Sequence, residues 1–295
     1  MSETKNEATD ERYIVQNLAR ALQVLWTLAS RKRPWTLEEL AHERGLNKAS
    51  LLRILRTLEA DRVVLRDGDA YALGPRVLDL SHAYLQNLEL DQIARPVMRA
   101  LAESAGHTVS LAVLDGAEVV YVGIEKAERE LGIQGEIGGR HPAHATALGK
   151  VLLADLPDDE VRARLGDGPL ERLTHRTVGG AEELIAALPA VRQRGFAVDD
   201  EERGLGIRCV AAPIRRHDGR VIGAMSLAGA IFHMSDEALE RHARAVVDAV
   251  GTVSERFGHT VASNDSEPDA HVRSDPQPTA TGGVPAGSAV SGGSD

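Results

Sequence analysis

Near the N-terminus, a short run of polar and cationic side chains has the types and the spacing needed to contact DNA. Asn47, Lys48, Ser50 and Arg53 fall within seven residues, and Arg56 follows three residues later. Lysine and arginine bind guanine edges or phosphates, and asparagine and serine exchange hydrogen bonds with either. An α-helix that begins with such residues fits the major groove. We therefore expect DNA contacts from these five residues, with a merely solvated helix face as the alternative interpretation.

The neighbouring sequence predicts the helices that would position this run. A first amphipathic helix is indicated by leucines at three- and four-residue steps, namely Leu18, Leu22, Leu25 and Leu28. The segment Thr36-Leu37-Glu38-Glu39 has the form of a capping box at the start of a second helix, which would end at Gly45. Asn47 can cap a third helix, whose apolar side consists of Leu51, Ile54, Leu55 and Leu58. Arg20 on the first helix and Thr36 at the start of the second are further expected DNA contacts.

A β-hairpin is expected directly after the third helix. Two apolar runs, 63–65 and 71–73, flank Asp67-Gly68-Asp69, and an Asp-Gly turn between apolar runs is typical of a hairpin. Three helices followed by such a hairpin have the layout of a winged helix-turn-helix.

The distribution of charge supports DNA binding although its sum does not. The net charge of −10 would argue against nucleic acid as a partner, because duplex binding depends on neutralised phosphates. Between Arg12 and Arg66, however, eleven basic residues outnumber five acidic ones, so this segment carries +6 and the remainder −16. A locally cationic domain on an acidic protein is therefore expected.

Composition places the chain among ordinary folded proteins. Hydrophobic residues make up 43% of the 295 residues and charged residues 26%, which suffices for two globular cores. No apolar run approaches about 18 residues and the first ten residues are polar, so neither a membrane span nor a secretion signal is expected. The single cysteine, Cys209, cannot form an internal disulfide, which fits a reducing compartment. We expect a cytoplasmic protein.

Beyond residue 75, the pattern predicts a mixture of helices and antiparallel strands. Helices are expected at 77–88, 91–104, 143–154, 182–194 and 235–257, and strands at 108–114, 118–124, 196–198, 207–213 and 221–228. This mixture predicts an α+β fold. From about residue 260 onward, Ser, Pro, Gly, Ala and Asp dominate, and such a segment cannot bury enough apolar surface to fold.

Several ordered motifs resemble one family of bacterial transcription factors. They are LARAL at 18–22, TLEELA at 36–41, GLNKASLLRIL at 45–55, YALGPR at 71–76, HATALGK at 144–150, RGFAVDDEE at 194–202 and CVAAP at 209–213. Together they resemble the IclR (isocitrate lyase regulator) family over roughly Val15 to Phe257. The resemblance implies a GAF-like effector domain behind the helix-turn-helix, and a homodimer or homotetramer that binds palindromic or repeated half-sites.

With this resemblance, the chain divides into five expected segments. They are a disordered N-terminus (1–11), a winged helix-turn-helix DNA-binding domain (12–74), a linker helix (75–90), an α+β effector-binding and oligomerisation domain (91–259) and a disordered tail (260–295). An effector bound in the second domain would change operator affinity through the helices between residues 75 and 104. The operator, the regulated genes, the effector, the sign of regulation, the choice between dimer and tetramer and the role of the tail stay open.

The resemblance also implies a pocket for a small carboxylate effector. The positions matching the family's pocket are Ala147, Leu148, Asp199, Cys209, Ser226 and Ala228, and we add His144 from the same helix start. Backbone donors at Ala143–Gly149 would suit an anion. Ala228 stands where the family often has serine, and His141 and Ala143 stand where it has bulkier aliphatic residues. A roomier, more polar pocket is expected, with an aromatic or sugar-derived carboxylate as effector.

Two alternative functions are weighed against this one. Cys209 with a histidine base could be a nucleophile, but it lies in an apolar strand, where a thiol tends to be inert. His141 and His144, with His107 and His175, could bind a metal, but no cysteine pair or His-Glu helix motif accompanies them, and no cofactor is expected. The second alternative is an interaction protein that does not bind DNA and uses its helix-turn-helix only for dimerisation. Taken alone, Cys209 is a buried small hydrophobe and Asp199 and Asp200 are turn residues.

Overall fold

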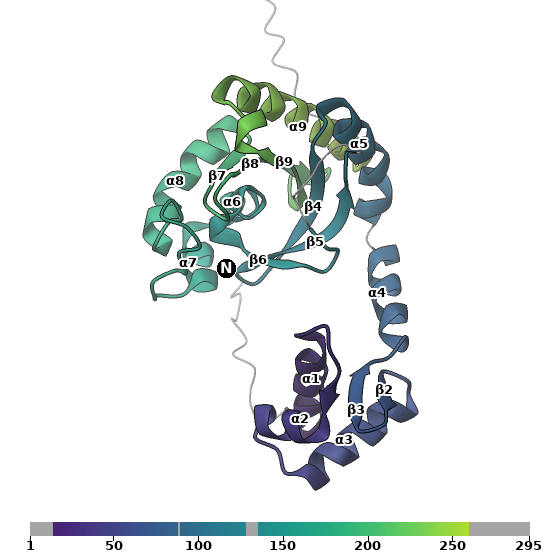
Figure 1. Cartoon of the computed structure of the whole chain (residues 1–295). Coiled ribbons are helices and arrows are strands. Elements are labelled where there is room, and N and C mark those ends of the chain that lie inside the picture. Colours follow the sequence, from purple (N-terminus) through teal and green to yellow (C-terminus); the bar gives the residue numbers. More distant parts are fainter. Residues whose placement is uncertain (1–13, 88, 128–134, 260–295) are drawn as a thin grey trace, which may run out of the picture. The chain divides into compact units, whose positions relative to one another are not determined.

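In a computed structural model of the chain, residues 14–87, 89–127 and 135–259 are described. The two segments expected to be disordered, 1–11 and 260–295, lie outside these residues, as does part of the glycine-rich segment before β6. Of the helices in the described ranges, none combines the length and the apolar composition needed to cross a bilayer. One helix, α4, connects an N-terminal part to a larger part built on a sheet (Figure 1).

The N-terminal part is a winged helix-turn-helix. Its elements are α1 (Gln16–Ala29), β1 (Trp35–Thr36), α2 (Leu37–Arg44), α3 (Lys48–Ala60), β2 (Val64–Asp67) and β3 (Ala70–Leu73). The strands form an antiparallel sheet in the order β1-β3-β2. One apolar core joins helices and sheet, consisting of Val24, Leu28, Trp35, Leu40, Ala41, Leu51, Leu55, Val64 and Tyr71. The expected helices and hairpin are confirmed. Strand β1 was not predicted, because two residues are too few to show an alternation of apolar and polar side chains.

Local signals determine where α2 and α3 begin. Thr36 Oγ1 accepts a hydrogen bond from Glu39 N at 3.2 Å, and Glu39 Oε2 accepts one from Thr36 N at 3.0 Å, which completes the capping box. Gly45 ends α2 with φ +60°, a left-handed conformation that suits glycine. Asn47 Oδ1 then accepts from Ser50 N at 2.8 Å and caps α3. The corner between the two helices is therefore encoded by the local sequence from Thr36 to Ser50.

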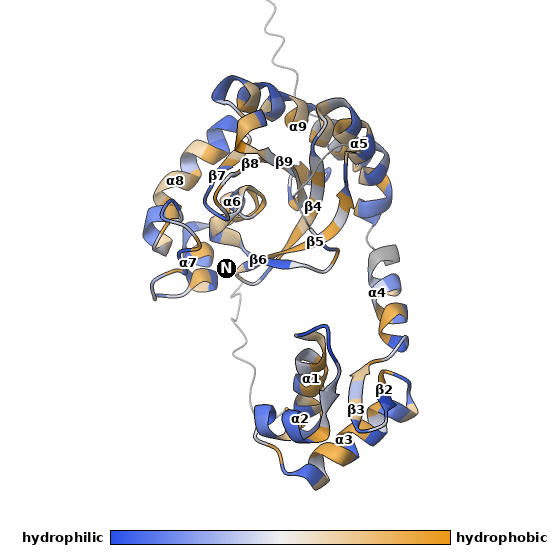
Figure 2. Ribbon diagram, viewed as in Figure 1, coloured by the Kyte–Doolittle hydropathy of each residue, from blue (hydrophilic) through white to orange (hydrophobic). Residues whose placement is uncertain are grey.

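Helix α4 (Arg76–Asn87) falls inside the expected linker, and α5 (Glu89–Ala105) begins two residues after α4 ends. Hydrophobic residues recur along α4 (Figure 2). Leu78 is 69% exposed, Leu80 68% and Tyr84 53%. These side chains therefore have no apolar partner among the described residues that shields them from solvent.

The larger part is an α+β domain, as expected. Its six strands form an antiparallel sheet in the order β6-β5-β4-β9-β8-β7. They are β4 (Thr108–Asp115), β5 (Glu118–Glu125), β6 (Arg140–Pro142), β7 (Ala197–Asp200), β8 (Ile207–Arg215) and β9 (Val221–Ala230). Its further helices are α6 (Ala147–Ala154), α7 (Asp158–Leu165), α8 (Ala181–Arg194) and α9 (Asp236–Arg256), with 3-10 turns η2 (Ala143–Ala145) and η3 (Ile231–His233).

The two faces of this sheet pack against different helices. Helices α5 and α9 share a core with Val210, Ala212 and Ile214 of β8, whereas α6 and α8 share one with Ala211 of the same strand. The alternation of side chains along each strand separates the two sets. The sheet curls around α6, so one face becomes concave and partly encloses that helix (Figure 1).

Three elements differ from the expectation. The helix expected from Ala143 begins only at Ala147, because Thr146 is extended and its Oγ1 accepts from Gly149 N at 2.9 Å as the N-cap. Helix α7 is not predicted by the sequence because it buries a single side chain, Val161, and so shows no apolar stripe. Strand β6 is three residues long and follows a glycine-rich segment, which hides it in the same way as β1.

Candidate nucleic-acid interface and ligand cavity

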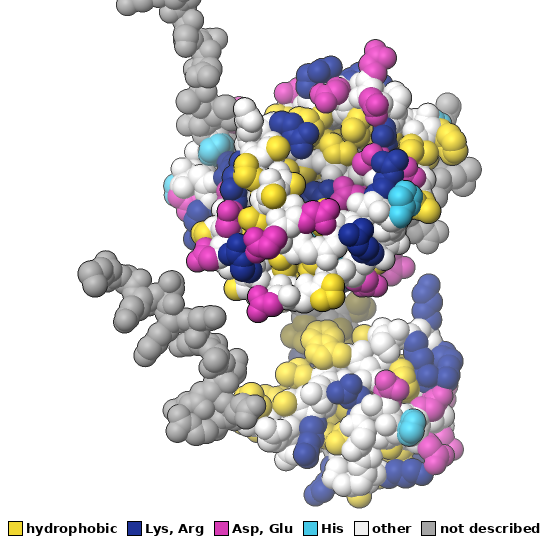
Figure 3. Space-filling model, turned by 90° about the vertical axis from the view of Figure 1, so that its left-hand side faces the viewer, with side chains coloured by type: hydrophobic (Ala, Val, Ile, Leu, Met, Phe, Trp, Pro, Cys, Tyr) yellow, Lys and Arg dark blue, Asp and Glu magenta, His cyan; other side chains and the backbone are white. Residues whose placement is uncertain are grey.

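Helix α3 buries Leu51 and Leu55 and exposes the opposite face. At four-residue spacing that face carries two stripes, one of Lys48, Leu52 and Arg56 and one of Ala49, Arg53 and Thr57. Basic side chains are prominent on the N-terminal part in space-filling view (Figure 3). The three cations expected to contact DNA from this helix therefore all reach solvent.

Lys48 and Arg56 each meet an exposed carboxylate. Lys48 Nζ lies 3.0 Å from Glu38 Oε1, and Arg56 Nη1 lies 3.4 Å from Glu59 Oε2. Exposed pairs of this kind contribute at most about 1 kcal/mol, so a DNA phosphate can replace either carboxylate. The Arg53 side chain forms no hydrogen bond or ion pair with any described residue, which leaves its guanidinium available.

Two expected contacts, Asn47 and Thr36, have their side-chain oxygens engaged in helix caps. At the start of α2, Glu39 also accepts hydrogen bonds from Arg33 at 2.8 Å and Arg31 at 2.6 Å. The bond from Arg33, the backbone N–H of Thr36 and the bond from Arg31 lower the pKa of Glu39 to about 2. The anion position expected at the start of α2 is thus partly occupied by a carboxylate of the protein itself.

A surface groove between α1 and α3 brings three further expected contacts together. Arg20 from α1 and Ser50 and Arg53 from α3 line it, with Asn17 and Thr57 beside them. Thr57 and Leu52 are exposed positions that the sequence interpretation did not include. The four-residue spacing from Arg53 to Thr57 and from Lys48 to Leu52 is the signal that could have found them.

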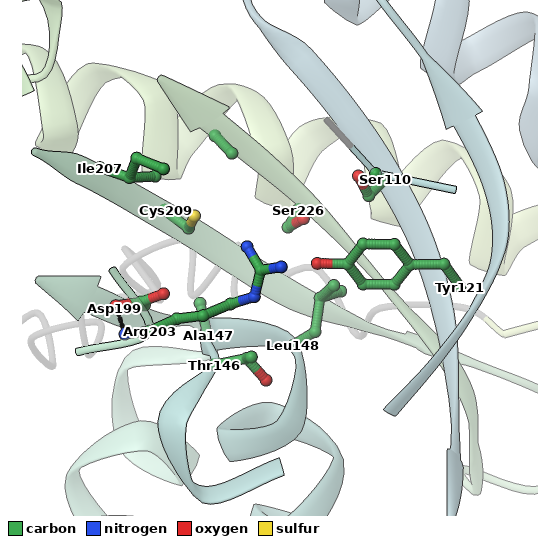
Figure 4. Close-up of a pocket in the computed structure, with 12 residues that line it drawn as sticks. Ser110, Tyr121, Thr146, Ala147, Leu148, Asp199, Arg203, Ile207, Cys209 and Ser226 are labelled. Atoms are coloured by element: carbon green, nitrogen blue, oxygen red, sulfur yellow. Dashed lines mark hydrogen bonds between the residues drawn. The ribbon is translucent and has the colours of Figure 1, made fainter. Parts of the chain in front are cut away.

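In the larger part, a cavity lies between the concave sheet face and the start of α6 (Figure 4). Six of the seven expected ligand residues line it, namely Ala147, Leu148, Asp199, Cys209, Ser226 and Ala228. The structure adds Ser110, Tyr121, Gly135, Thr146, Arg203 and Ile207. Side chains from β4, β5, α6, β7, β8 and β9 therefore meet at one place.

The register of the sheet explains this convergence. Ser110 of β4 pairs with Ser226 of β9, and Ala228 of β9 pairs with Cys209 of β8, which in turn pairs with Asp199 of β7. Residues paired across antiparallel strands share a face, and alternate residues along a strand return to that face. All five side chains therefore lie on the face that α6 covers.

Asp199 is the buried acid of the cavity. It is 1% exposed, and its Oδ1 accepts hydrogen bonds from Glu202 N at 2.7 Å and Arg203 N at 3.2 Å. Burial outweighs these two donors and raises the pKa of Asp199 to about 6. Nearby, Lys150 donates to the Val198 carbonyl at 3.0 Å and pairs with Glu202. A carboxylate that titrates near neutral pH therefore forms part of the cavity wall.

One expectation about this pocket needs correction. His144 does not line the cavity, because η2 directs its ring toward the Glu171 carbonyl, 3.0 Å from Nε2. The free space in the cavity is about 20 Å³, enough for about one water molecule. The side chain of Arg203 occupies part of the space between the other lining residues (Figure 4).

The lining residues that were not expected differ in how well the sequence could have predicted them. Ser110 is a hydroxyl within the apolar run of β4, and such a break in a buried strand is a usable signal. Arg203 comes from the segment between β7 and β8, where no periodicity marks which side chains turn inward. For Tyr121, the pairing of β5 with β4 across the short turn at Asp115-Gly116 is visible in the sequence, but the face on which its ring lies depends on the register shift between Leu111 and Ala112.

The positions of the histidines and of Cys209 bear on the two other candidate chemistries, a metal site and a cysteine nucleophile. Over the described ranges, no three His, Cys, Asp or Glu side chains are grouped in a way that could hold a metal ion. Cys209 is half-buried in the cavity wall, between the sheet neighbours Asp199 and Ala228. His141 lies within hydrogen-bond distance of Arg203, which lines the cavity, at 3.0 Å from Nη2 to Nε2.

Comparisons with known proteins agree with this architecture. Residues 17–68 match the IclR helix-turn-helix domain and residues 82–255 match the bacterial transcriptional regulator IclR C-terminal domain. The HTH-type transcriptional regulator XynR of Escherichia coli K12 is 33% identical over 250 residues, which cover 83% of this chain and 98% of that protein. A crystal structure described as a transcriptional regulator from Rhodococcus sp. RHA1 is 35% identical, with a TM-score of 0.73 over 83% of this chain and 99% of that one.

A further solved structure shares the fold at lower identity. It is an IclR homologue from Microbacterium hydrocarbonoxydans complexed with 4-hydroxybenzoate, 23% identical, with a TM-score of 0.72 over 82% of this chain and 99% of that one.

Proposed function

The chain belongs to the IclR family of bacterial transcriptional regulators, and from that premise we propose which of its residues bind the operator and which bind the effector. It is a DNA-binding regulator with an N-terminal helix-turn-helix and a C-terminal effector domain. Operator contacts are assigned to Lys48, Ser50, Arg53 and Arg56 of α3 and to Arg20 of α1, with Asn47 and Thr36 contributing mainly by positioning the two helices.

Specificity is assigned to the exposed stripes of α3. The Arg53 side chain has no hydrogen-bond or ion-pair partner in the described part of the chain, so it is the first candidate for a guanine edge. Lys48 and Arg56 can exchange their carboxylate partners for phosphates and so set register and affinity. Leu52, 36% exposed, offers an apolar contact for a thymine methyl group.

The effector is a small organic acid bound in the cavity of the larger part. The observation that carries this assignment is the convergence of Asp199, Cys209 and Ser226 with Ser110 and Ala228 on the face covered by α6. Hydroxyl groups of Ser110, Thr146 and Ser226 supply hydrogen bonds, and Tyr121 supplies an aromatic wall. An aromatic carboxylate is the first class to test, since a protein of the same fold has been solved with 4-hydroxybenzoate.

A homo-oligomer is proposed from exposed apolar side chains on α1. Val15, Leu18, Leu22 and Trp26 are 65%, 60%, 46% and 72% exposed and follow one helix side at three- and four-residue steps. A second copy of the chain would cover them and present two reading helices to repeated half-sites. Effector binding would then alter operator affinity through α4 and α5, which connect the two parts.

The enzyme alternative is not favoured. The proteins that match over most of this chain are transcriptional regulators. We assign Cys209 to the cavity wall, where a small polarizable side chain packs well, and not to nucleophilic catalysis.

The experiment begins with DNA selection from a random duplex library by the full chain. Fluorescence anisotropy on a selected fragment is then repeated with 4-hydroxybenzoate, gluconate, pyruvate and glyoxylate. We expect one of the two larger acids to change operator affinity by about tenfold or more, within the usual range of allosteric coupling. Selection of no DNA would refute operator binding. Acids that bind in calorimetry and leave anisotropy unchanged would refute the coupling.

A further inference from the structure

Arg203 is the one cation among the described residues that line the cavity. The cations around it pair with carboxylates: Arg208 with Asp200 and Asp236, and Lys150 with Glu202. Arg203 instead donates from Nη2 to the imidazole of His141, 3.0 Å from Nε2 and 3.2 Å from Nδ1. No carboxylate of the described residues forms an ion pair with it. Its guanidinium therefore has no salt-bridge partner among the described residues.

His141 can accept this bond only as a neutral ring. Burial, followed by the charge of Arg203, lowers the pKa of His141 to about 4. The ring also packs against Tyr121, with ring centroids 5.0 Å apart. A carboxylate gives a guanidinium an ion pair with two parallel hydrogen bonds, whereas a neutral imidazole has one nitrogen that can accept and carries no charge. An incoming carboxylate would therefore be a better partner for Arg203 than the imidazole is.

The surroundings of the guanidinium suit such a carboxylate. Figure 4 shows the Arg203 guanidinium and the Tyr121 hydroxyl pointing toward one another, with Ser110 and Ser226 on the adjoining strands. A guanidinium offers two parallel N–H donors, and hydroxyl groups can donate to the remaining lone pairs of a carboxylate. The hydroxyl groups of Ser110, Tyr121 and Ser226 come from β4, β5 and β9, and the guanidinium comes from the segment between β7 and β8. No single segment of the sequence contains this cluster of donors.

The same side chain controls the space available. About 20 Å³ is free while Arg203 extends into the cavity, and an organic acid of several heavy atoms cannot fit there. The backbone of Arg203 is held by Asp199 Oδ1 at 3.2 Å, so the side chain can rotate while its attachment stays in place. Rotation of Arg203 away from His141 would enlarge the free space as well as free the guanidinium for an acid.

We propose that Arg203 is the residue that selects anionic effectors, and that the effector carboxylate takes the place of His141 as the partner of its guanidinium. This inference rests on the proposed function, and it narrows the ligand class to acids whose carboxylate is ionised. Neutral analogues of the same shape gain no partner for the guanidinium and must still break its bond to His141. They bind more weakly for both reasons.

The test measures binding of matched acids and amides to the full chain by calorimetry. The probes are 4-hydroxybenzoate, benzoate and pyruvate, each with its primary amide, against wild type and Arg203→Met. Hydrogen bonds to charged groups typically contribute 1.5–3 kcal/mol, so we expect an acid-to-amide preference of about 10- to 100-fold in wild type. In Arg203→Met the preference falls to about one, because the charge that distinguishes the two ligands is gone.

Two control variants show whether a loss of the acid-to-amide preference comes from the missing guanidinium or from a damaged fold. Arg220→Met removes one positive charge at an exposed position in the turn between β8 and β9, and it retains the wild-type preference. Arg203→Lys keeps the charge without the paired donors and gives an intermediate preference. Thermal melting of all variants accompanies the titrations. Should Arg203→Met fail to fold, the comparison of Arg203→Lys with wild type decides, and an unchanged preference there overturns the proposal.

Operator binding in the same samples separates this proposal from the function on which it rests. Acids that bind Arg203→Met as tightly as wild type overturn the role of Arg203 and leave effector binding intact. Amides that bind wild type as well as the acids do, or a wild type that binds no acid, also overturn the proposal. Operator affinity of the wild type, measured without ligand, shows independently whether the regulator function stands.

Discussion

Gly149 passes so close to Ala143 that a Cβ on its α-carbon would lie 2.1 Å from the Ala143 carbonyl oxygen and 2.3 Å from its Cα. Both contacts are with backbone, which cannot move aside as a flexible side chain would. This approach locks η2 against the first turn of α6, the turn that carries Ala147 and Leu148 into the cavity. The glycine in the segment HATALGK is thus required by packing and not by a left-handed φ.

Gly149→Ala is therefore expected to lower the free energy of unfolding by about 1–3 kcal/mol, the range for overpacked cores, and to weaken acid binding as the start of α6 shifts. Denaturant titration and calorimetry measure the two effects. Gly251→Ala in α9 is the matched control, because its Cβ would meet nothing within 4 Å. That control should be neutral or stabilising by up to about 1 kcal/mol. A Gly149→Ala variant as stable as wild type would show that η2 is free to move.

Asn47→Ala removes the N-cap of α3 and is expected to destabilise the chain by about 1 kcal/mol. Asn47→Asp keeps an oxygen for the Ser50 N–H and should restore stability, but it places a negative charge where DNA approaches. We therefore expect Asn47→Asp to match wild type in denaturant titration and to bind operator more weakly. Equal operator affinity of Asn47→Asp and wild type would mean that this helix start does not face DNA.

Arg53→Ala is expected to weaken operator binding by about 10- to 100-fold and to relax specificity at one base pair, if its guanidinium contacts a guanine. Lys48→Ala should weaken binding to all sequences alike and reduce the slope of log affinity against log salt by about one. Anisotropy at several salt concentrations with matched and mutated operators separates the two patterns. Arg220→Ala, an exposed change in the larger part, serves as the charge control. Unchanged affinity and slope in both α3 variants would favour the non-DNA-binding interpretation.

Acid binding should strengthen as the pH falls from 7.5 to 5.5. Burial raises the pKa of Asp199 to about 6, so this carboxyl is ionised at the upper pH and largely protonated at the lower. The ionised form repels an anionic effector, and the protonated form does not. We expect a gain of about three- to tenfold for an acid that stays ionised throughout. The charged or titratable groups that act on this carboxyl or border it are Glu202, Lys150, Arg203, Cys209 and Tyr121.

Asp199→Asn is the control for that pH dependence. The amide oxygen can still accept from the N–H groups of Glu202 and Arg203, while the charge is removed. Its affinity for acids should equal the low-pH value of the wild type at every pH. An unchanged pH slope in this variant would assign the titration to another group.

Stability should fall when the pH drops below about 6.5, the ordinary value for histidine. Burial, then the nearby His107 and Arg241, lower the pKa of His242, so the folded chain holds this ring neutral where the unfolded chain protonates it. The contribution of the neutral His242 ring to folding stability is fully present above the pKa that this ring has in the unfolded chain. It is lost as the pH falls below that value toward the lower pKa of the folded chain. Its ring lies 5.2 Å from that of His107, which in turn lies 6.1 Å from that of His233. Thermal melting of wild type and His242→Gln measures this, and the variant should show a smaller loss of Tm from pH 7.5 to pH 5.5.

Local chemistry made much of the fold predictable. The capping box of Thr36 and Glu39, the Asn47 cap and the Asp-Gly turn at Gly68 each depend on residues a few positions apart, and each is present. Long amphipathic helices such as α9 were equally visible. Three elements were not predicted, namely α7, β1 and β6. They are short or bury too few side chains to show a hydrophobic periodicity in the sequence.

The candidate site divides in the same way. Family motifs located the wall made by Ala147, Asp199 and Cys209, whereas Ser110 meets Ser226 through a strand pairing between distant segments and Tyr121 depends on the register of the β4–β5 hairpin. Arg203 could not be foreseen because its direction depends on the path of the segment between β7 and β8. The free space in the pocket could not be predicted for the same reason, because it depends on where the Arg203 side chain lies.

The order of the strands also has a consequence for biosynthesis. The centre of the large sheet joins β4 to β9, so Ser110 finds its neighbour Ser226 only after more than a hundred intervening residues have been made. Such distant pairings slow folding, and a chain emerging from the ribosome cannot close this sheet until β9 has left the exit tunnel. The winged part has no such requirement, because its core is complete by Tyr71. During translation, the DNA-binding end should therefore become folded well before the end that controls it.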